Sequence, residues 1–319
     1  MKKMIKLSLV AAVAVAGLST SAVAGSLENA VKNTDLSGYL RLRVNTTHSQ
    51  ATEASSVNNE QKAVLNFKSK VNDSVTANMK FVAVGGSKSD SLNFNQANFI
   101  VAGGAYTAIV GKQTAQSPFV ANNGDTVATG ATVLVPAGPV TIAAAHYDDA
   151  TSSAPGTLTL DGKTPTTTGA VTVTALAVIG KFGPVSAELW AAATANTDHT
   201  AILASANVGP VSVSAHHATT DVDNATSVND DISNTQLVVS GKAGAASVFA
   251  AYATTGQDSG NVTIDNDTDS KLIFALEGAA DTRVGDVDAM VVGASAKIAS
   301  VKAGIIYMDG EAGTTSFDE

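Results

Sequence analysis

The sequence predicts an all-β fold, and more specifically a transmembrane antiparallel β-barrel of about 16 to 18 strands. Three observations lead to this prediction. Apolar and polar residues alternate along many stretches, which is the pattern of strands with one face in lipid and one in water. Short glycine-containing turns recur on one side of these stretches, while connections on the other side are long and acidic. After residue 24, no stretch reaches the roughly 18 consecutive apolar residues of a membrane helix.

Composition narrows the class of protein. Of 319 residues, 45% are hydrophobic and 15% are charged, and the formal net charge is −9. The lack of cysteine excludes disulfide scaffolds, thiolate metal sites and cysteine nucleophiles. The acidic balance argues against a nucleic-acid partner, which needs a basic patch. The sequence contains no nucleophile elbow, phosphate loop or zinc-binding helix motif, and we therefore do not expect an enzyme.

The N-terminus is typical of a secretory signal peptide over residues 1–24. Three lysines precede an apolar run from Leu7 to Leu18, and Ala22-Val23-Ala24 offers a cleavage site of the small-x-small kind. The run is too short for the alternative, an N-terminal membrane anchor. Residues 25–319 are predicted to form the barrel, and an exported acidic chain without cysteine is typical of the bacterial envelope.

The first strands show the alternation clearly. In residues 36–46 the apolar side chains Leu36, Leu40 and Leu42 alternate with polar ones, and residues 61–71 and 74–84 repeat the pattern on either side of a turn at Asn72-Asp73. The polar face of these strands collects Arg41, Arg43, Lys62, Lys68, Lys70 and Lys80. Strands of about ten residues have the length of a tilted membrane crossing.

A weak internal repeat supplies the turns between later strands. Its members are Gly138-Pro139, Gly183-Pro184, Gly209-Pro210 and, more loosely, Gly244-Ala245. Glycine accepts a positive φ and proline cannot donate to a sheet, so these pairs predict tight turns between antiparallel strands. The opposite connections, residues 148–168, 221–233 and 254–270, are longer and acidic. This asymmetry is that of periplasmic turns and extracellular loops in an outer-membrane barrel.

The alternation and the turns together place the strands. We expect them near residues 36–46, 61–71, 74–84, 92–102, 106–113, 127–135, 139–148, 169–180, 184–194, 200–207, 210–219, 234–241, 245–254, 271–278, 286–296 and 299–308. If the strands alternate in direction, the last of these runs the wrong way for a periplasmic turn at residues 297–300. One element between residues 255 and 296 is therefore misassigned.

A ring-shaped side chain recurs at one height on the apolar face. Counting six residues from the first apolar residue after a turn leads to Phe81, His146, His217, Tyr252 and Tyr307. This spacing predicts an interfacial girdle, and the alternative is the chance placement of aromatic residues in strands. The neighbouring His216 and His217 point to opposite faces of a strand, so they do not hold a metal together.

Two patches resemble the Campylobacter-type (epsilonproteobacterial) major outer membrane porin family. Residues 26–43 are similar to the opening of such porins, and residues 110–119 with 122–125 and Gly130 are similar to the segment that leads into their pore-narrowing loop. The resemblance implies an outer-membrane barrel that passes small hydrophilic solutes and ions by passive diffusion. It also implies surrounding outer-membrane lipid, a homotrimer and no cofactor.

In a barrel of this kind we expect charged side chains to line the lumen. The candidates are Arg41, Arg43, Lys68 and Lys80 on the early strands, opposed by Asp125 of an inward-folded loop over residues 114–126 and by Glu188 of a later strand. The alternative is that the lysines merely keep a polar face solvated. Ion selectivity stays open, because the negative net charge and the basic wall argue in opposite directions.

The acidic loops leave a second interpretation open. Asp265, Asp267 and Asp269 are spaced as Ca²⁺ ligands are, without the glycine and glutamate of an EF-hand, so a solvated acidic loop is the alternative to a calcium site. A secreted or surface structural or adhesive β-protein with such loops is the alternative function, although the irregular spacing of the turn glycines disfavours a solenoid. The chain ends at Glu319 without the usual final aromatic residue, and we expect that a closing strand or strands are missing.

Overall fold

The computed structural model describes residues 34–49, 54–86, 91–120, 126–152, 171–222, 232–258, 262–264, 271–272, 285–298 and 301–318. The chain falls into two compact units. The first contains the chain up to Thr114 together with Val127–Val133, and the second contains Ala115–Thr126 and Leu134–Glu319. No helix within the described ranges has the length and hydropathy of a membrane span. The expected signal peptide, residues 1–24, lies outside these ranges.

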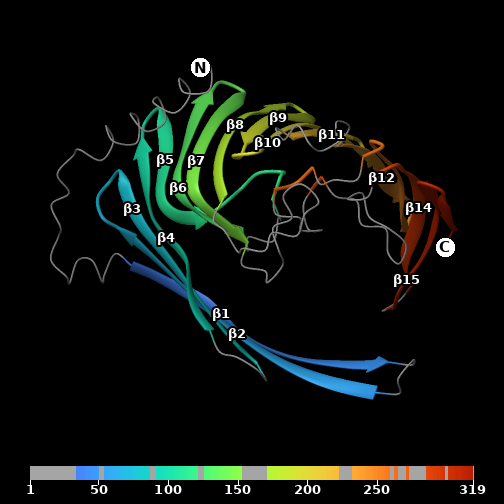
Figure 1. Ribbon diagram of the computed structural model, residues 1–319, viewed down its shortest axis with the longest axis horizontal. Coiled ribbons are helices and arrows are strands. Elements are labelled where there is room, and N and C mark those ends of the chain that lie inside the picture. The colour runs from blue at the N-terminus through green and yellow to red at the C-terminus, as the bar shows by residue number, and fades with distance from the viewer. Residues whose placement is uncertain are drawn as a thin grey trace. The chain divides into compact units, whose positions relative to one another are not determined.

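The predicted all-β antiparallel architecture is confirmed in the described ranges (Figure 1). A sheet of 16 strands follows the order of the sequence, as expected when each strand pairs with the one before it. The strands are β1 (Thr34–Ser49), β2 (Ala54–Lys70), β3 (Val75–Gly86), β4 (Ser91–Gly103), β5 (Tyr106–Thr114), β6 (Thr126–Ala137), β7 (Val140–Ser152), β8 (Val171–Phe182), β9 (Val185–Ala193), β10 (Thr197–Val208), β11 (Val211–Val222), β12 (Ile232–Ala243), β13 (Ala246–Thr255), β14 (Val287–Ile298), β15 (Val301–Ala312) and β16 (Thr315–Asp318).

The strand predicted over residues 271–278 does not stand between its predicted neighbours in the sheet, and only the first two residues of this stretch lie within the described ranges. Lys271 and Leu272 lie in a turn, and β13 pairs directly with β14, with Thr254 opposite Asp288. Of the apolar residues that suggested a strand, Leu272 is described, and its side chain is buried. Without this strand, the connection between β14 and β15 lies on the same side as the other short turns. The conflict of direction is thereby removed.

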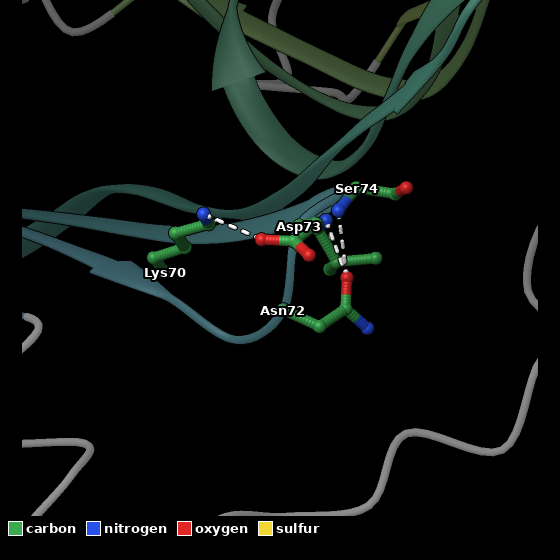
Figure 2. A network of polar contacts seen from close by, with 5 residues as sticks. Lys70, Asn72, Asp73 and Ser74 are labelled. Carbon is green, nitrogen blue, oxygen red and sulfur yellow. Dashed lines mark hydrogen bonds and ion pairs between the residues drawn. The ribbon is translucent and has the colours of Figure 1, made fainter.

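The short turns have the geometry that their residues favour. Gly183 and Gly209 have φ values of 62° and 60°, and each starts a two-residue turn that ends in proline. Positive φ at the first central residue is characteristic of a type II′ turn, whose twist suits antiparallel strands. Residues 71–74 form a wider connection than the predicted two-residue turn (Figure 2). There, Asn72 Oδ1 accepts hydrogen bonds from the backbone N–H groups of Ser74 and Val75, at 2.9 and 2.8 Å.

The strands of the second unit have two different faces, which we call inner and outer. On β10 the side chains of Ala201 and Leu203 are buried on the inner face, while Ile202 is 53% exposed on the outer face. The same alternation continues through β8, β11, β12, β13 and β14. Large apolar side chains are therefore exposed on the outer face, the reverse of a water-soluble sheet.

Candidate functional site

Near the loop ends of the strands, the inner face of the second unit is covered by two chain segments. The first comprises residues 115–120, which follow β5. It begins with a hydrogen bond from Ala115 N to Thr126 O at 3.0 Å. The Phe119 side chain is 0% exposed, and its ring centroid lies 5.6 Å from that of His199 on β10. The predicted inward folding of residues 114–126 thus agrees with the described part of the loop, while Asp125 lies outside it.

The ring of Phe119 packs against the ring of His199. His199 belongs to the buried row of β10, and each of its ring nitrogens has a threonine hydroxyl as its partner. Nε2 lies 3.0 Å from Thr197 Oγ1, and Nδ1 lies 2.9 Å from Thr220 Oγ1. Because a hydroxyl can either donate or accept, this arrangement satisfies a neutral imidazole in either tautomer. No pattern in the sequence distinguishes His199 as a contact of the inward segment.

The second segment comes from the long connection between β13 and β14. Its described residues are 262–264 and 271–272, and Val262, Ile264 and Leu272 are buried. The Ile264 N–H donates to Phe119 O at 2.7 Å, so the two segments are directly linked. Interpretation of residues 254–270 as a purely external acidic loop missed this folding. The signal was present in the apolar residues of an otherwise acidic stretch.

Side chains of the inner wall hold the second segment by its carbonyl groups. Leu272 O accepts hydrogen bonds from Asn234 Nδ2 at 2.7 Å and from Gln236 Nε2 at 2.5 Å, both on β12. Lys271 O lies 3.1 Å from His216 Nδ1 on β11. The carbonyl can only accept, so Nδ1 of His216 carries the proton of this hydrogen bond. His216 therefore faces inward, and the expected separation from His217 is confirmed.

A charged pair lies at the edge of this segment. Glu188 on β9 accepts a hydrogen bond at Oε2 from Trp190 Nε1 at 2.8 Å, and its Oε1 lies 4.0 Å from Lys271 Nζ. Pairing across β9, β10 and β11 puts Glu188, Leu203 and His216 in one row of the sheet. The predicted inner-face residue Glu188 thus has a cationic partner that the sequence did not reveal.

Toward the short turns the same face is open. A cavity of about 1010 Å³ is lined there by hydroxyl-bearing, small and apolar residues and by one lysine. Its lining includes Ser212, Ser247, Ser295, Lys242 and Phe249. Within the second unit, the inner face therefore changes from a filled level near the loops to a wide, hydroxyl-rich level near the turns.

The basic candidates of the first unit share one face of its sheet. Arg41 on β1 lies directly opposite Lys62 on β2, whereas Arg43 lies opposite Glu60. Lys68 and Lys80 occupy positions of the same parity on the neighbouring strands, opposite Asn78 and Asn66.

This polar face continues across β3, β4 and β5 through amide and hydroxyl groups. Asn78 Nδ2 donates to Gln96 Oε1 at 2.7 Å, and Gln96 Nε2 donates to Thr114 Oγ1 at 2.7 Å. This series of side-chain hydrogen bonds ends at Thr114, the last residue of β5 before the inward segment. The opposite face of β1 exposes Leu40 to 71% and Leu42 to 68%.

The girdle candidates all lie on faces that expose apolar residues. Phe81 pairs with Leu65 and contacts the ring of Phe94 at 4.3 Å between centroids. Three of the other candidates make polar contacts from the same kind of face: His146 with Thr174 at 2.9 Å, His217 with Thr235 at 2.8 Å, and Tyr252 with Asp288 at 2.9 Å. Tyr307 is 50% exposed and shares its face of β15 with the exposed Ile305.

The calcium candidate can be placed only in part. Asp265, Asp267 and Asp269 lie outside the described residues. Within the described ranges, no group of three or more potential ligands among histidine, aspartate and glutamate is close enough to hold a metal ion.

Comparison with known proteins places this geometry among membrane channels. The chain matches the family model of the Campylobacter major outer membrane protein over residues 1–313. None of the curated proteins compared with the chain matches it. The fold is similar to Pseudomonas aeruginosa OccK1 (OpdK), with a TM-score of 0.68 and 14% identity over 88% of this chain and 83% of that one. Similar values hold for Pseudomonas aeruginosa OpdQ (0.67, 14%, 90% and 85%) and Acinetobacter baumannii OccAB4 (0.64, 13%, 87% and 81%).

Proposed function

The chain belongs to the Campylobacter major outer membrane protein family, and from this premise we propose that the two inner-face segments set the width of its channel. The protein is an outer-membrane porin, a multi-pass β-barrel through which small solutes cross. The family and the fold imply a channel rather than an enzyme, and they disfavour the alternative of a secreted structural or adhesive protein.

The observation that carries the proposal is the filling of the inner face at one level only. Phe119 and Leu272 are almost wholly buried where the two segments meet the wall, while serine side chains border an open cavity nearer the turns. A lumen filled by side chains at one level and open at another limits the size of the solutes that cross. Apolar exposure on the outer face supports the placement of that face in lipid.

We also propose that Arg41, Arg43, Lys68 and Lys80 line the channel. Their common face and the direct opposition of Arg41 and Lys62 support this role, since rings of charged side chains control ion passage in pores. Replacement of Arg41 and Arg43 by alanine is expected to shift the reversal potential under a salt gradient. An unchanged reversal potential would remove both residues from the narrow part of the channel.

The placement of Phe81, His146, His217, Tyr252 and Tyr307 on apolar faces supports our proposal that they meet the membrane interfaces. Amphipathic rings are favoured at that level.

The proposal that the porin is a homotrimer rests on the family resemblance. The apolar face of β1 is one surface that a second copy can cover, and chemical crosslinking in detergent measures the number of subunits. A calcium site at Asp265, Asp267 and Asp269 remains a proposal carried by their spacing alone.

Reconstitution of the full chain in planar bilayers tests the function directly. We expect stepwise conductance, together with migration on a detergent gel that changes on heating, as folded barrels show when they unfold. Liposome swelling with sugars of increasing size then measures the exclusion limit. A folded protein that conducts no ions and admits no sugar would contradict the channel function.

A further inference from the structure

We propose that Lys271 and Glu188 form a compensated charge pair at the filled level of the channel, so that loss of either charge alone changes the ion selectivity. The inference deepens the proposed function and depends on it. It assigns a role to a residue of the connection between β13 and β14, which the sequence had suggested to be an external loop and a strand.

The backbone of Lys271 is held in place independently of its charge. Its carbonyl contacts His216 Nδ1 at 3.1 Å, and the next carbonyl, that of Leu272, accepts hydrogen bonds from Asn234 and Gln236. The Leu272 side chain is 1% exposed and acts as an apolar anchor. These contacts hold the Lys271 backbone at the inner wall without any contribution from Glu188.

The charged atoms of the pair face water. The Lys271 side chain is 49% exposed and that of Glu188 is 24% exposed, with Nζ and Oε1 4.0 Å apart. A solvent-exposed pair of this kind contributes little to stability. Trp190 Nε1 donates to Glu188 Oε2 at 2.8 Å and so orients the carboxylate. The arrangement leaves both charges available to ions that pass along the inner face.

The pair stands apart from the other charges of this unit. On the described inner face of the second unit, strand parity places Lys181, Lys242 and Lys297 near the short turns, and Lys242 lines the wide cavity there. Lys271 and Glu188 lie at the filled level instead. Because the interaction of an ion with a fixed charge weakens with distance and with water between them, a charge at a narrow level affects passage more than one in a wide cavity.

The electrostatic consequence has a definite sign. In the wild type the two charges compensate each other locally. Removal of the Lys271 charge leaves Glu188 alone, which favours cations, and removal of the Glu188 charge leaves Lys271 alone, which favours anions. A single charge about 8 Å from a permeant ion in a watery lumen changes the local concentration of each ion about two-fold, and thus the cation-to-anion permeability ratio about four-fold.

The test measures reversal potentials of single channels of the full chain under a potassium chloride gradient. Lys271→Gln is expected to raise the cation-to-anion permeability ratio about four-fold, and Glu188→Gln to lower it by a similar factor. The double variant is expected to return close to the wild type. Lys242→Gln is the matched control in the wide cavity, and its shift is expected to be clearly smaller. Lys271→Arg, which keeps the charge, is expected to keep the wild-type ratio.

Two further readouts show whether the variants retain the fold. Trp190 is the only tryptophan in the chain, so its fluorescence reports on the environment of Glu188. Unchanged emission in Lys271→Gln shows that the inner wall beside the pair is intact, and heat-modified migration shows a folded barrel. Glu188→Gln disturbs none of the hydrogen bonds that hold residues 271–272, and it therefore tests the pair separately from the docking of that segment.

The results separate the two levels of the proposal. Absence of conductance in the wild-type protein would overturn the channel function itself. A conducting wild type in which Lys271→Gln and Glu188→Gln shift the permeability ratio no more than Lys242→Gln would overturn the selectivity role and leave the channel function standing.

Discussion

Truncation of Phe119 to alanine tests the idea that its ring holds the first inward segment against the wall. The side chain is 0% exposed and packs on His199, so its loss removes a fully buried aromatic contact. Phenylalanine-to-alanine changes in packed sites cost about 3–5 kcal/mol. About 1.4 kcal/mol corresponds to a factor of ten in an equilibrium constant. The equilibrium constant for docking of residues 115–120 therefore falls by a factor of at least about 100.

The expected outcome is a wider channel. Single-channel conductance should rise, and liposome swelling should admit larger sugars, because residues 115–120 no longer remain on the inner face. The second segment is expected to be loosened less, because Asn234 and Gln236 also hold it through the carbonyl of Leu272. Thermal unfolding followed by heat-modified migration measures the stability of the barrel separately.

Phe182→Ala is the matched control. It makes the same truncation on the outer face, where the ring is 50% exposed and has no contact with the inward segments among the described residues. Conductance and the exclusion limit should stay at wild-type values in this variant. If Phe119→Ala also kept both values in a folded barrel, the ring could not be what limits the channel, and the reasoning from its burial would fail.

Three further expectations concern the lipid face, a turn and an exposed ion pair. Leu189→Arg places a charge on the outer face, at a cost of about 2–4 kcal/mol if the site lies near the bilayer centre. The yield of assembled protein in liposomes should therefore fall for Leu189→Arg and not for Ser186→Arg, which lies on the opposite face. Equal yields would refute the assignment of faces. Gly209→Ala forces a residue with a side chain to a φ of 60° and should destabilise the barrel by about 1–2 kcal/mol, measured as a lower urea midpoint in lipid. The hydrogen bond and charge of Lys70 hold the pKa of Asp73 below its ordinary value of 3.8. The resulting small stabilisation is present above that value and is lost as the pH falls through the lower folded-state pKa. NMR titration should show a higher pKa of Asp73 in Lys70→Ala than in the wild type.

The sheet was predictable because its signals are local. Alternation with a period of two places Leu40 and Arg41 on opposite faces whatever the neighbouring strands are, and a glycine followed by proline favours a turn by its own dihedral angles. The inward folding of residues 115–120 agreed with the family resemblance. The early basic residues therefore appear on one face in the structure, as expected.

The prediction failed where local pattern and long-range packing disagree. Residues 271–278 look like a strand because they are apolar, but β13 reaches β14 directly and leaves no place for another strand between them. The burial of Leu272 satisfies the same apolar character by contact with the inner wall. Periodicity reports that a side chain avoids water, and it does not report which surface covers it.

By itself, the sequence determined most of the strands, their two faces, the short turns and the family, since each depends on neighbours along the chain. Only the tertiary structure decided that Lys271 meets Glu188, that Phe119 rests on His199, and that the connection between β13 and β14 covers the inner wall. These contacts join residues far apart in the chain. Their stability comes from burial and hydrogen bonds formed across the curved inner face, which exist only after the strands have paired.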